Sequence, residues 1–187
     1  MNIMSSSLRL KNVFRAAPLA VLVLALVFLQ VVNAKGNMVH IVISVKEQKL
    51  NLLSDTGELL HSYLVSTSRF GIGSEPGSNK TPQGRFRIAD KIGDGIPIGE
   101  ILVSRIATGQ FGQDGDPHDH VQTRILWLDG LDPENANTHD RYIYIHGTNS
   151  ESKLGTPASF GCVRMSNHDV IDLYDRVEEG TAVEIVL

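Results

Sequence analysis

Short apolar runs separated by turn residues follow one another along most of this chain, and this pattern limits the folds open to it. Brief runs rich in Val, Ile and Leu are typical of strands, whereas an amphipathic helix repeats its apolar residues every three or four positions over a longer span. Turn-like residues at 46–48 and 54–57 separate the first three runs, which therefore predict a meander. The predicted strands are 39–45, 49–53, 58–65, 84–89, 123–128, 141–145 and 181–187.

One segment near the C-terminus predicts a helix. Residues 167–177 have helical apolar spacing, Ser166 and Asp169 form a capping box at the start, and Gly180 follows the end. Residues 66–84, in contrast, form a Gly-, Ser- and Pro-rich loop that is longer than a simple connection requires. The sequence therefore predicts a mainly β domain with one short helix, and a long loop that forms part of a binding cleft.

The first 34 residues have the features of a secretory signal peptide, in the expected order. Three basic residues and no acidic one precede an apolar run at 18–29, and a small-x-small pattern ends at Ala34. We expect cleavage after Ala34 and export to the periplasm or cell envelope. The alternative is an N-terminal membrane anchor, because residues 16–32 approach the roughly 20 apolar residues that a spanning helix needs.

Charge and length narrow the class of protein further. Without residues 1–34 the chain has 153 residues, with 14 Lys or Arg against 21 Asp or Glu, and thus a net charge of −7. This length suits one domain with a substantial core. The negative charge argues against nucleic acid or anionic lipid as the main partner.

Cys162 is the only cysteine, so no disulfide can form within the chain. A lone thiol in an exported protein is either shielded as a small apolar side chain or used as a reactive group. Gly161 before it permits a close backbone approach, and the predicted strand at 141–145 runs directly into His146. An imidazole can take the proton of a thiol and return it to a leaving amine, so Cys162 and His146 are a candidate catalytic pair.

The sequences around this pair, IYIHGTN at 143–149 and SFGCVRMSN at 159–167, resemble the L,D-transpeptidase catalytic domain, or YkuD domain, of bacterial cell-wall enzymes. The segment TPQGRFRI at 81–88 is similar to a third motif of that family. The resemblance covers residues 38–187 and implies an L,D-transpeptidase-like β-sandwich of mixed sheets with one short helix near the C-terminus. One position departs from the family pattern, because many members have histidine where this chain has Phe160.

The resemblance also implies roles for residues around the pair. The main-chain carbonyl of Gly147 is expected to hold the second imidazole nitrogen of His146. The oxyanion of the tetrahedral intermediate needs donors, and backbone N–H groups around Gly161 and Cys162 are the natural source, with Ser159 supporting the same loop. Arg164 either binds a substrate carboxylate or braces the loop through an ion pair, and bracing is favoured.

The function implied is that of an exported cysteine acyltransferase. Family members cleave the terminal D-alanine from a peptidoglycan tetrapeptide stem through a cysteine thioester and pass the stem to an amine, either of a second stem or of a lipoprotein that becomes anchored to the wall. Water as acceptor would make the protein a carboxypeptidase or hydrolase, and a catalytically inactive wall-binding module is an alternative from another class. Carbapenem-type inhibitors are expected to acylate the cysteine, and no cofactor is expected.

A second polar segment is a weaker candidate site. His118 and His120 are two residues apart and lie beside Asp116 and Asp119, an arrangement that a strand could turn toward a metal ion. The spacing marks no third or fourth ligand, so we expect no metal there.

Basic residues gather near the long loop. They are candidates for local attraction of an anionic wall, or else solvated surface charges. These residues are Arg69, Lys80, Arg85 and Arg87.

Overall fold

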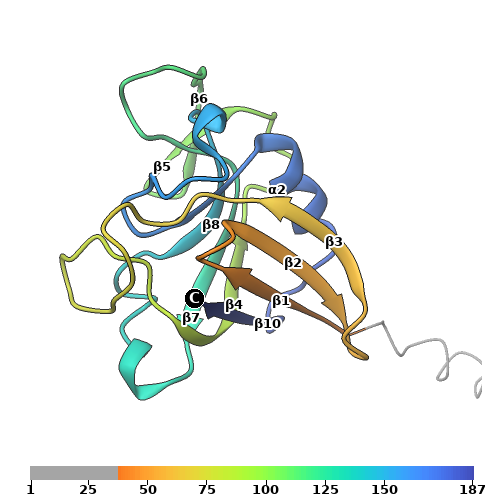
Figure 1. The fold of residues 1–187 in the computed structure, drawn as a ribbon. Coiled ribbons are helices and arrows are strands. Elements are labelled where there is room, and N and C mark those ends of the chain that lie inside the picture. The colour runs from red at the N-terminus through yellow and green to blue at the C-terminus, as the bar shows by residue number, and fades with distance from the viewer. Residues whose placement is uncertain (1–37) are drawn as a thin grey trace, which may run out of the picture. The chain divides into compact units, whose positions relative to one another are not determined.

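The computed structural model describes residues 38–187, so the expected signal peptide and its cleavage site lie outside the described residues. Ten strands form one sheet whose hydrogen-bonded path runs β3-β2-β1-β10-β4-β7-β5-β6, with β8 paired to β7 and to β9 (Figure 1). The strands are β1 (Val39–Ser44), β2 (Lys49–Ser54), β3 (Leu59–Leu64), β4 (Gly84–Ile92), β5 (Glu100–Val103), β6 (Ile106–Phe111), β7 (Val121–Gly130), β8 (Tyr144–Thr148), β9 (Val163–Met165) and β10 (Ala182–Val186). The helices are α2 (Asn167–Tyr174) and the 3-10 turns η1 (Pro133–Asn135) and η2 (Glu151–Lys153).

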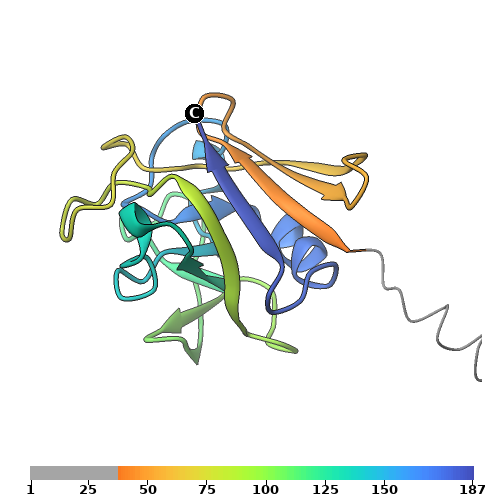
Figure 2. The same ribbon diagram turned by 90° about the horizontal axis from the view of Figure 1, so that it is seen from below.

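The sheet mixes antiparallel and parallel pairing. The meander β1-β2-β3 is antiparallel, as its turn residues predict, whereas β1 pairs in parallel with β10 and β8 pairs in parallel with β9. Figure 2 shows β10 lying between β1 and β4, so the last strand joins the N-terminal meander to the rest of the sheet. The predicted mainly β fold with mixed pairing and one short helix is confirmed, and its strands form one continuous curled sheet.

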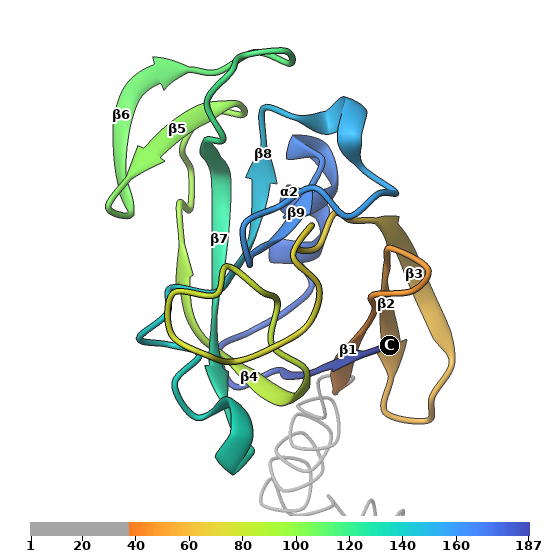
Figure 3. The ribbon, with the colours of Figure 1, turned by 60° about the vertical axis from the view of Figure 1, so that its left-hand side comes forward.

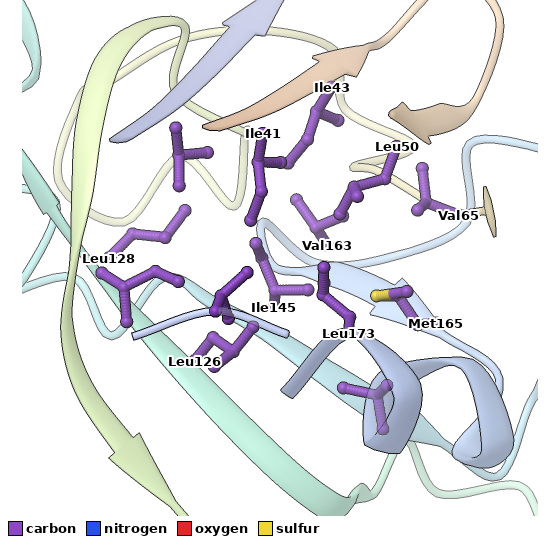
Figure 4. Packing of buried hydrophobic residues seen from close by; sticks show 14 of the residues in the cluster. Ile41, Ile43, Leu50, Val65, Leu126, Leu128, Ile145, Val163, Met165 and Leu173 are labelled. Carbon is purple, nitrogen blue, oxygen red and sulfur yellow. The ribbon is translucent and has the colours of Figure 1, made fainter. Parts of the chain in front are cut away.

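The curl of the sheet encloses the main apolar core. Fully buried side chains from β1, β2, β4, β7, β8, β9 and β10 meet there, and α2 packs against them through Val170 and Leu173 (Figure 4). Burial of apolar side chains is the main favourable contribution to folding, at about 25 cal/mol per Å² removed from water. The core therefore fixes β8, which contains His146, and β9, which directly follows Cys162.

Alternation along β8 and β9 divides their side chains between two faces. The parallel register places His146 beside Arg164 and Ile145 beside Val163. Ile145 and Val163 belong to the main core. Because side chains alternate along a strand, His146 and Arg164 point to the opposite face. Cys162, which immediately precedes β9, packs against a cluster that includes Tyr144 on the same face of β8 as His146.

Several boundaries differ from the sequence prediction. β5, β6 and β9 were not predicted, and every residue of β6 is exposed, so that strand has no apolar alternation to detect. Figure 3 shows β5 and β6 as a hairpin that extends beyond β7. The strand predicted from residue 141 begins only at Tyr144, because Tyr142 has a left-handed φ of 56° within a turn.

The predicted helix at 167–177 is shorter in the structure. α2 ends at Tyr174, where the Asp175 N–H closes the last turn on Ile171 and the Arg176 N–H bonds to Leu173 three residues back. At its start, Ser166 accepts from the Asp169 N–H, which is one half of the predicted capping box. Among residues 38–187, we find no helix with the length and apolar character needed to cross a membrane.

Candidate active site

The thiol of Cys162 is partly exposed and lies against the backbone just before and at the start of β8. Its sulfur is 3.4 Å from the Tyr144 nitrogen, whose N–H donates to it, and 3.4 Å from the Tyr142 carbonyl oxygen, which accepts from the thiol. A small apolar cluster that includes Leu102 and Ile125 packs beside it. Burial disfavours the charged form and outweighs the Tyr144 N–H bond, which favours it, so the pKa of the Cys162 thiol is raised to about 11 and the thiol is protonated at neutral pH.

The imidazole of His146 is buried and held in one tautomer. Its Nδ1 lies 2.7 Å from the carbonyl oxygen of Gly147, and because a carbonyl only accepts, Nδ1 carries the hydrogen. In the neutral ring Nε2 then has a free lone pair, as a general base requires. Burial lowers the pKa of His146 below its usual 6.5, which favours that neutral ring.

Cys162 and His146 are therefore both neutral in this conformation. No hydrogen bond joins the two side chains within residues 38–187, although Cys162 packs against the cluster that contains Tyr144, which shares the His146 face of β8. Proton transfer between them therefore requires the thiol to leave the Tyr142 carbonyl that it contacts in this conformation. The geometry suits proton transfer during attack better than a permanently charged thiolate–imidazolium pair.

The loop before Cys162 is tied together by Ser159. The Ser159 hydroxyl donates to the Cys162 carbonyl at 2.6 Å and accepts from the Gly161 N–H at 3.2 Å. The Gly161 N–H is thus already engaged, so the Cys162 N–H is the better candidate oxyanion donor. Gly161 has a φ of +126°, a conformation that side-chain-bearing residues rarely adopt, which explains why glycine precedes the thiol.

Thr81, from the TPQGRFRI segment, fixes the same loop from the other side. Its hydroxyl donates to the Gly161 carbonyl at 2.9 Å and accepts from the Ser68 N–H at 2.9 Å, and the Thr81 side chain is fully buried. The start of the long loop at 66–84 and the loop that carries Cys162 are therefore joined through one residue. This contact gives a structural reason for the third sequence motif.

Arg164 lies beside His146 and is 2% exposed. Its Nη2 donates to the carboxylate of Asp119, while its buried Nε has no partner in residues 38–187. A buried cation that loses its only counter-charge is strongly destabilising. The ion pair fits the favoured bracing role, because it ties β9 to the segment that contains Asp119.

That segment is the polar stretch considered above for a metal. His120 Nε2 is 3.4 Å from a carboxylate oxygen of Asp116, and the backbone at His118 and His120 is bonded to the Asn149 side chain at 2.7 and 2.8 Å. No group of three or more His, Cys, Asp or Glu side chains within residues 38–187 is arranged to hold a metal ion. The segment instead contributes Asp119 to the face that contains the candidate pair.

Comparison with known protein families identifies the family of this domain. A model of the L,D-transpeptidase catalytic domain, YkuD, matches residues 38–185, which is most of the chain. The chain belongs to the L,D-transpeptidase family.

Individual relatives match smaller parts. YqjB of Bacillus subtilis, provisionally named an L,D-transpeptidase, is 33% identical over 109 residues, which are 55% of this chain and 59% of YqjB. YkuD of the same organism, also provisionally named, is 51% identical over 41 residues, or 22% of this chain and 25% of that protein. The chain thus covers less than two thirds of the length of each.

Solved structures agree on the fold. L,D-transpeptidase 3 from Mycobacterium tuberculosis, in complex with a faropenem-derived adduct, matches 81% of this chain and 61% of its own chain with a TM-score of 0.53 and 18% identity. An L,D-transpeptidase from Mycobacterium smegmatis matches 81% of this chain and 60% of its own, with a TM-score of 0.52 and 18% identity. At this identity the likeness concerns the fold of the L,D-transpeptidase domain alone.

Sequence reasoning missed two residues that this L,D-transpeptidase domain places at the site. Asp119 was noted only as part of a possible metal segment, and its actual partner, Arg164, is 45 residues away in the chain. Asn149 holds the same segment and directly follows the IYIHGT strand. The available signal was a short stretch rich in hydrogen-bonding and charged side chains. Such a stretch predicts that partners exist, but its sequence does not identify them.

Proposed function

We propose that this protein is an exported cysteine acyltransferase that cleaves the terminal D-alanine from a peptidoglycan tetrapeptide stem and transfers the stem to an amine. The observation that carries the proposal is the fixed tautomer of His146, whose Nδ1 is bonded to the Gly147 carbonyl at 2.7 Å. Its side chain lies on the face of β8 that also carries Tyr144, and the cluster around Tyr144 packs against Cys162. A partly exposed thiol and a buried, oriented base on one face are what nucleophilic acyl transfer needs.

In the first half-reaction the Cys162 sulfur attacks the carbonyl carbon of the third stem residue as its proton passes to His146 Nε2. The carbonyl oxygen becomes an oxyanion that the Cys162 N–H can stabilise. The carbon–nitrogen bond to D-alanine then breaks, the amine takes the proton from His146, and a thioester remains on Cys162. The protein supplies the orientation and the proton transfer, and the energy of the broken peptide bond is retained in the thioester.

In the second half-reaction an amine attacks the thioester carbonyl and gives its proton to His146. The carbon–sulfur bond breaks, Cys162 regains a proton from His146, and a new amide links the stem to the acceptor. The acceptor is a side-chain amine of a second stem in cross-linking, or a lysine of a lipoprotein in anchoring. Both share the chemistry of a primary amine.

The test is incubation of the purified protein with tetrapeptide stems, followed by mass spectrometry of all products. Release of D-alanine with formation of a peptide dimer supports transpeptidation. Release of D-alanine with only the tripeptide identifies water as the acceptor, and hence a carboxypeptidase. Binding of stems without any release would refute the proposal in favour of a wall-binding module.

Export is a second part of the proposal and rests on the sequence of residues 1–34. The mature protein should begin at Lys35, because the small residues at 32 and 34 suit a signal peptidase. N-terminal sequencing of the protein from the envelope fraction tests this directly. A chain that still begins with Met1 would refute cleavage and favour the alternative of an N-terminal membrane anchor.

A further inference from the structure

Four basic residues near the long loop were candidates for attracting the wall. Three of them have carboxylate partners in the structure, and the fourth, Arg69, differs. Lys80 Nζ is 3.7 Å from a Glu75 carboxylate oxygen. Arg85 donates two hydrogen bonds to Asp132, at 2.6 and 2.9 Å, and Arg87 donates two to Asp129, at 2.8 and 3.1 Å. Arg69 has no carboxylate partner within residues 38–187.

Arg69 is instead stacked on aromatic rings. Its guanidinium carbon lies 4.1 Å from the centroid of the Phe160 ring and 5.1 Å from that of the Phe70 ring. Both phenylalanines are 46% exposed, and their rings are 5.9 Å apart. A guanidinium that stacks through its face keeps its N–H edge free for two parallel hydrogen bonds to a carboxylate.

This stacked group belongs to the rim of the candidate active site. The Arg69 N–H donates to the Ser159 carbonyl at 3.2 Å, and the Ser159 N–H donates to the Thr67 carbonyl at 2.9 Å. Phe160 is two residues before Cys162 on the same loop. These bonds fix the backbone at 67–69 against the loop at 159–162, and the stacking on Phe160 places the guanidinium over the loop that carries the nucleophile.

We propose that Arg69, stacked on Phe70 and Phe160, binds a carboxylate of the stem peptide and so positions the donor for attack by Cys162. The inference rests on the proposed function and adds a binding residue to it. Stacking limits the rotamers of a long side chain before the ligand arrives, which reduces the entropy lost on binding. It also gives an acidic protein one local cationic site for an anionic substrate.

Two carboxylates of the donor could provide this chemistry, namely the terminal carboxylate of D-alanine and the free carboxylate of the third, diamino acid residue. The experiment compares three donors, which are the unmodified tetrapeptide and two forms with one or the other carboxylate converted to an amide. Each is assayed by D-alanine or D-alaninamide release with wild type, Arg69→Gln, Arg69→Lys and Arg87→Gln. Arg87→Gln is the matched control, because it removes an exposed arginine that is paired to Asp129.

We expect Arg69→Gln to raise KM for the unmodified donor about tenfold with little change in kcat, the size of loss typical of one charge-assisted contact. Arg69→Lys should recover part of that loss, and Arg87→Gln should match wild type. For the donor that lacks the recognised carboxylate, wild type should show the raised KM and Arg69→Gln should add nothing. An equal effect of Arg69→Gln on all three donors would overturn the inference and leave Arg69 a structural role.

The two proposals fail in different ways. If wild type releases nothing from any donor, the proposed function is wrong, and calorimetric binding of the three peptides to the Cys162→Ala protein then tests the carboxylate site alone. Tenfold weaker binding of the unmodified peptide to the protein with both Cys162→Ala and Arg69→Gln would support the site. Equal binding would exclude it.

Discussion

The two faces of β8 and β9 have opposite properties although alternate residues of the same two short strands build them. On the core face Ile145 and Val163 are fully buried among apolar side chains. On the other face His146 and Arg164 are also almost fully buried, but each depends on one specific polar partner, Gly147 and Asp119. The apolar face therefore holds the strands in place, and the polar face uses that rigidity to orient chemical groups.

The largest expected effect separates chemistry from stability on the polar face. Cys162→Ser should lower D-alanine release from a stem peptide by about a thousandfold or more, because a hydroxyl is far harder to ionise and the hydrogen-bond partner of His146 Nδ1 is a main-chain carbonyl, not a carboxylate. The melting temperature should stay close to that of wild type, because the two side chains are nearly isosteric. Release at the wild-type rate would show that another residue is the nucleophile.

The next effect concerns the base. His146→Ala should lower D-alanine release about 100- to 10,000-fold, and alkylation of Cys162 by iodoacetamide at pH 7 should slow as well. Because burial lowers the pKa of His146, the wild-type rate should be lost only as the pH falls below 6.5, when the ring becomes protonated. Equal alkylation rates in wild type and His146→Ala from pH 5 to 9 would mean that the two side chains do not communicate.

On the apolar face the effect should fall on stability instead. Ile145→Ala removes a fully buried side chain from the core and should reduce the free energy of unfolding by about 2–5 kcal/mol. Urea denaturation measures this loss. A change below about 1 kcal/mol would contradict the division between the two faces, because it would place Ile145 outside the packed core.

The smallest effect concerns the polar partner of Arg164. Asp119→Asn leaves a buried guanidinium without its counter-charge and should cost about 1–2 kcal/mol, less than for a fully buried pair because Asp119 is partly exposed. Asp140→Asn, an exposed change with the same loss of charge, is the control and should stay within about 0.5 kcal/mol of wild type. Equal stability of the two variants would remove the bracing role of Arg164.

The difference between apolar and polar faces also explains how much of the fold could be predicted from the sequence. Apolar alternation identified most strands of the curled sheet and the helix, because burial leaves a periodic trace in the sequence. β6 left no such trace, since all its residues are exposed, and β9 is only three residues long. Those strands are defined by pairing with neighbours, which a local pattern does not record.

The candidate site divides in a similar way. Cys162 and His146 could be named from residue types and the motifs around them, and the resemblance suggested the Gly147 carbonyl as the partner of His146. The pairing of Arg164 with Asp119 and the stacking of Arg69 on Phe160 could not be predicted from the sequence, because each joins segments far apart in the chain. Polar partners are chosen by three-dimensional proximity, and hydrogen-bonding capacity alone is shared by many residues.

The most direct test of the central claim, that Cys162 is the activated nucleophile of an acyltransferase, is intact-mass spectrometry of the protein with a carbapenem. A strained lactam carbonyl tests the thiol, its base and the oxyanion donor together without knowledge of the natural acceptor. We expect one drug-sized adduct on wild type and none on Cys162→Ser. Unmodified wild-type protein, or an adduct that persists in Cys162→Ser, would contradict it.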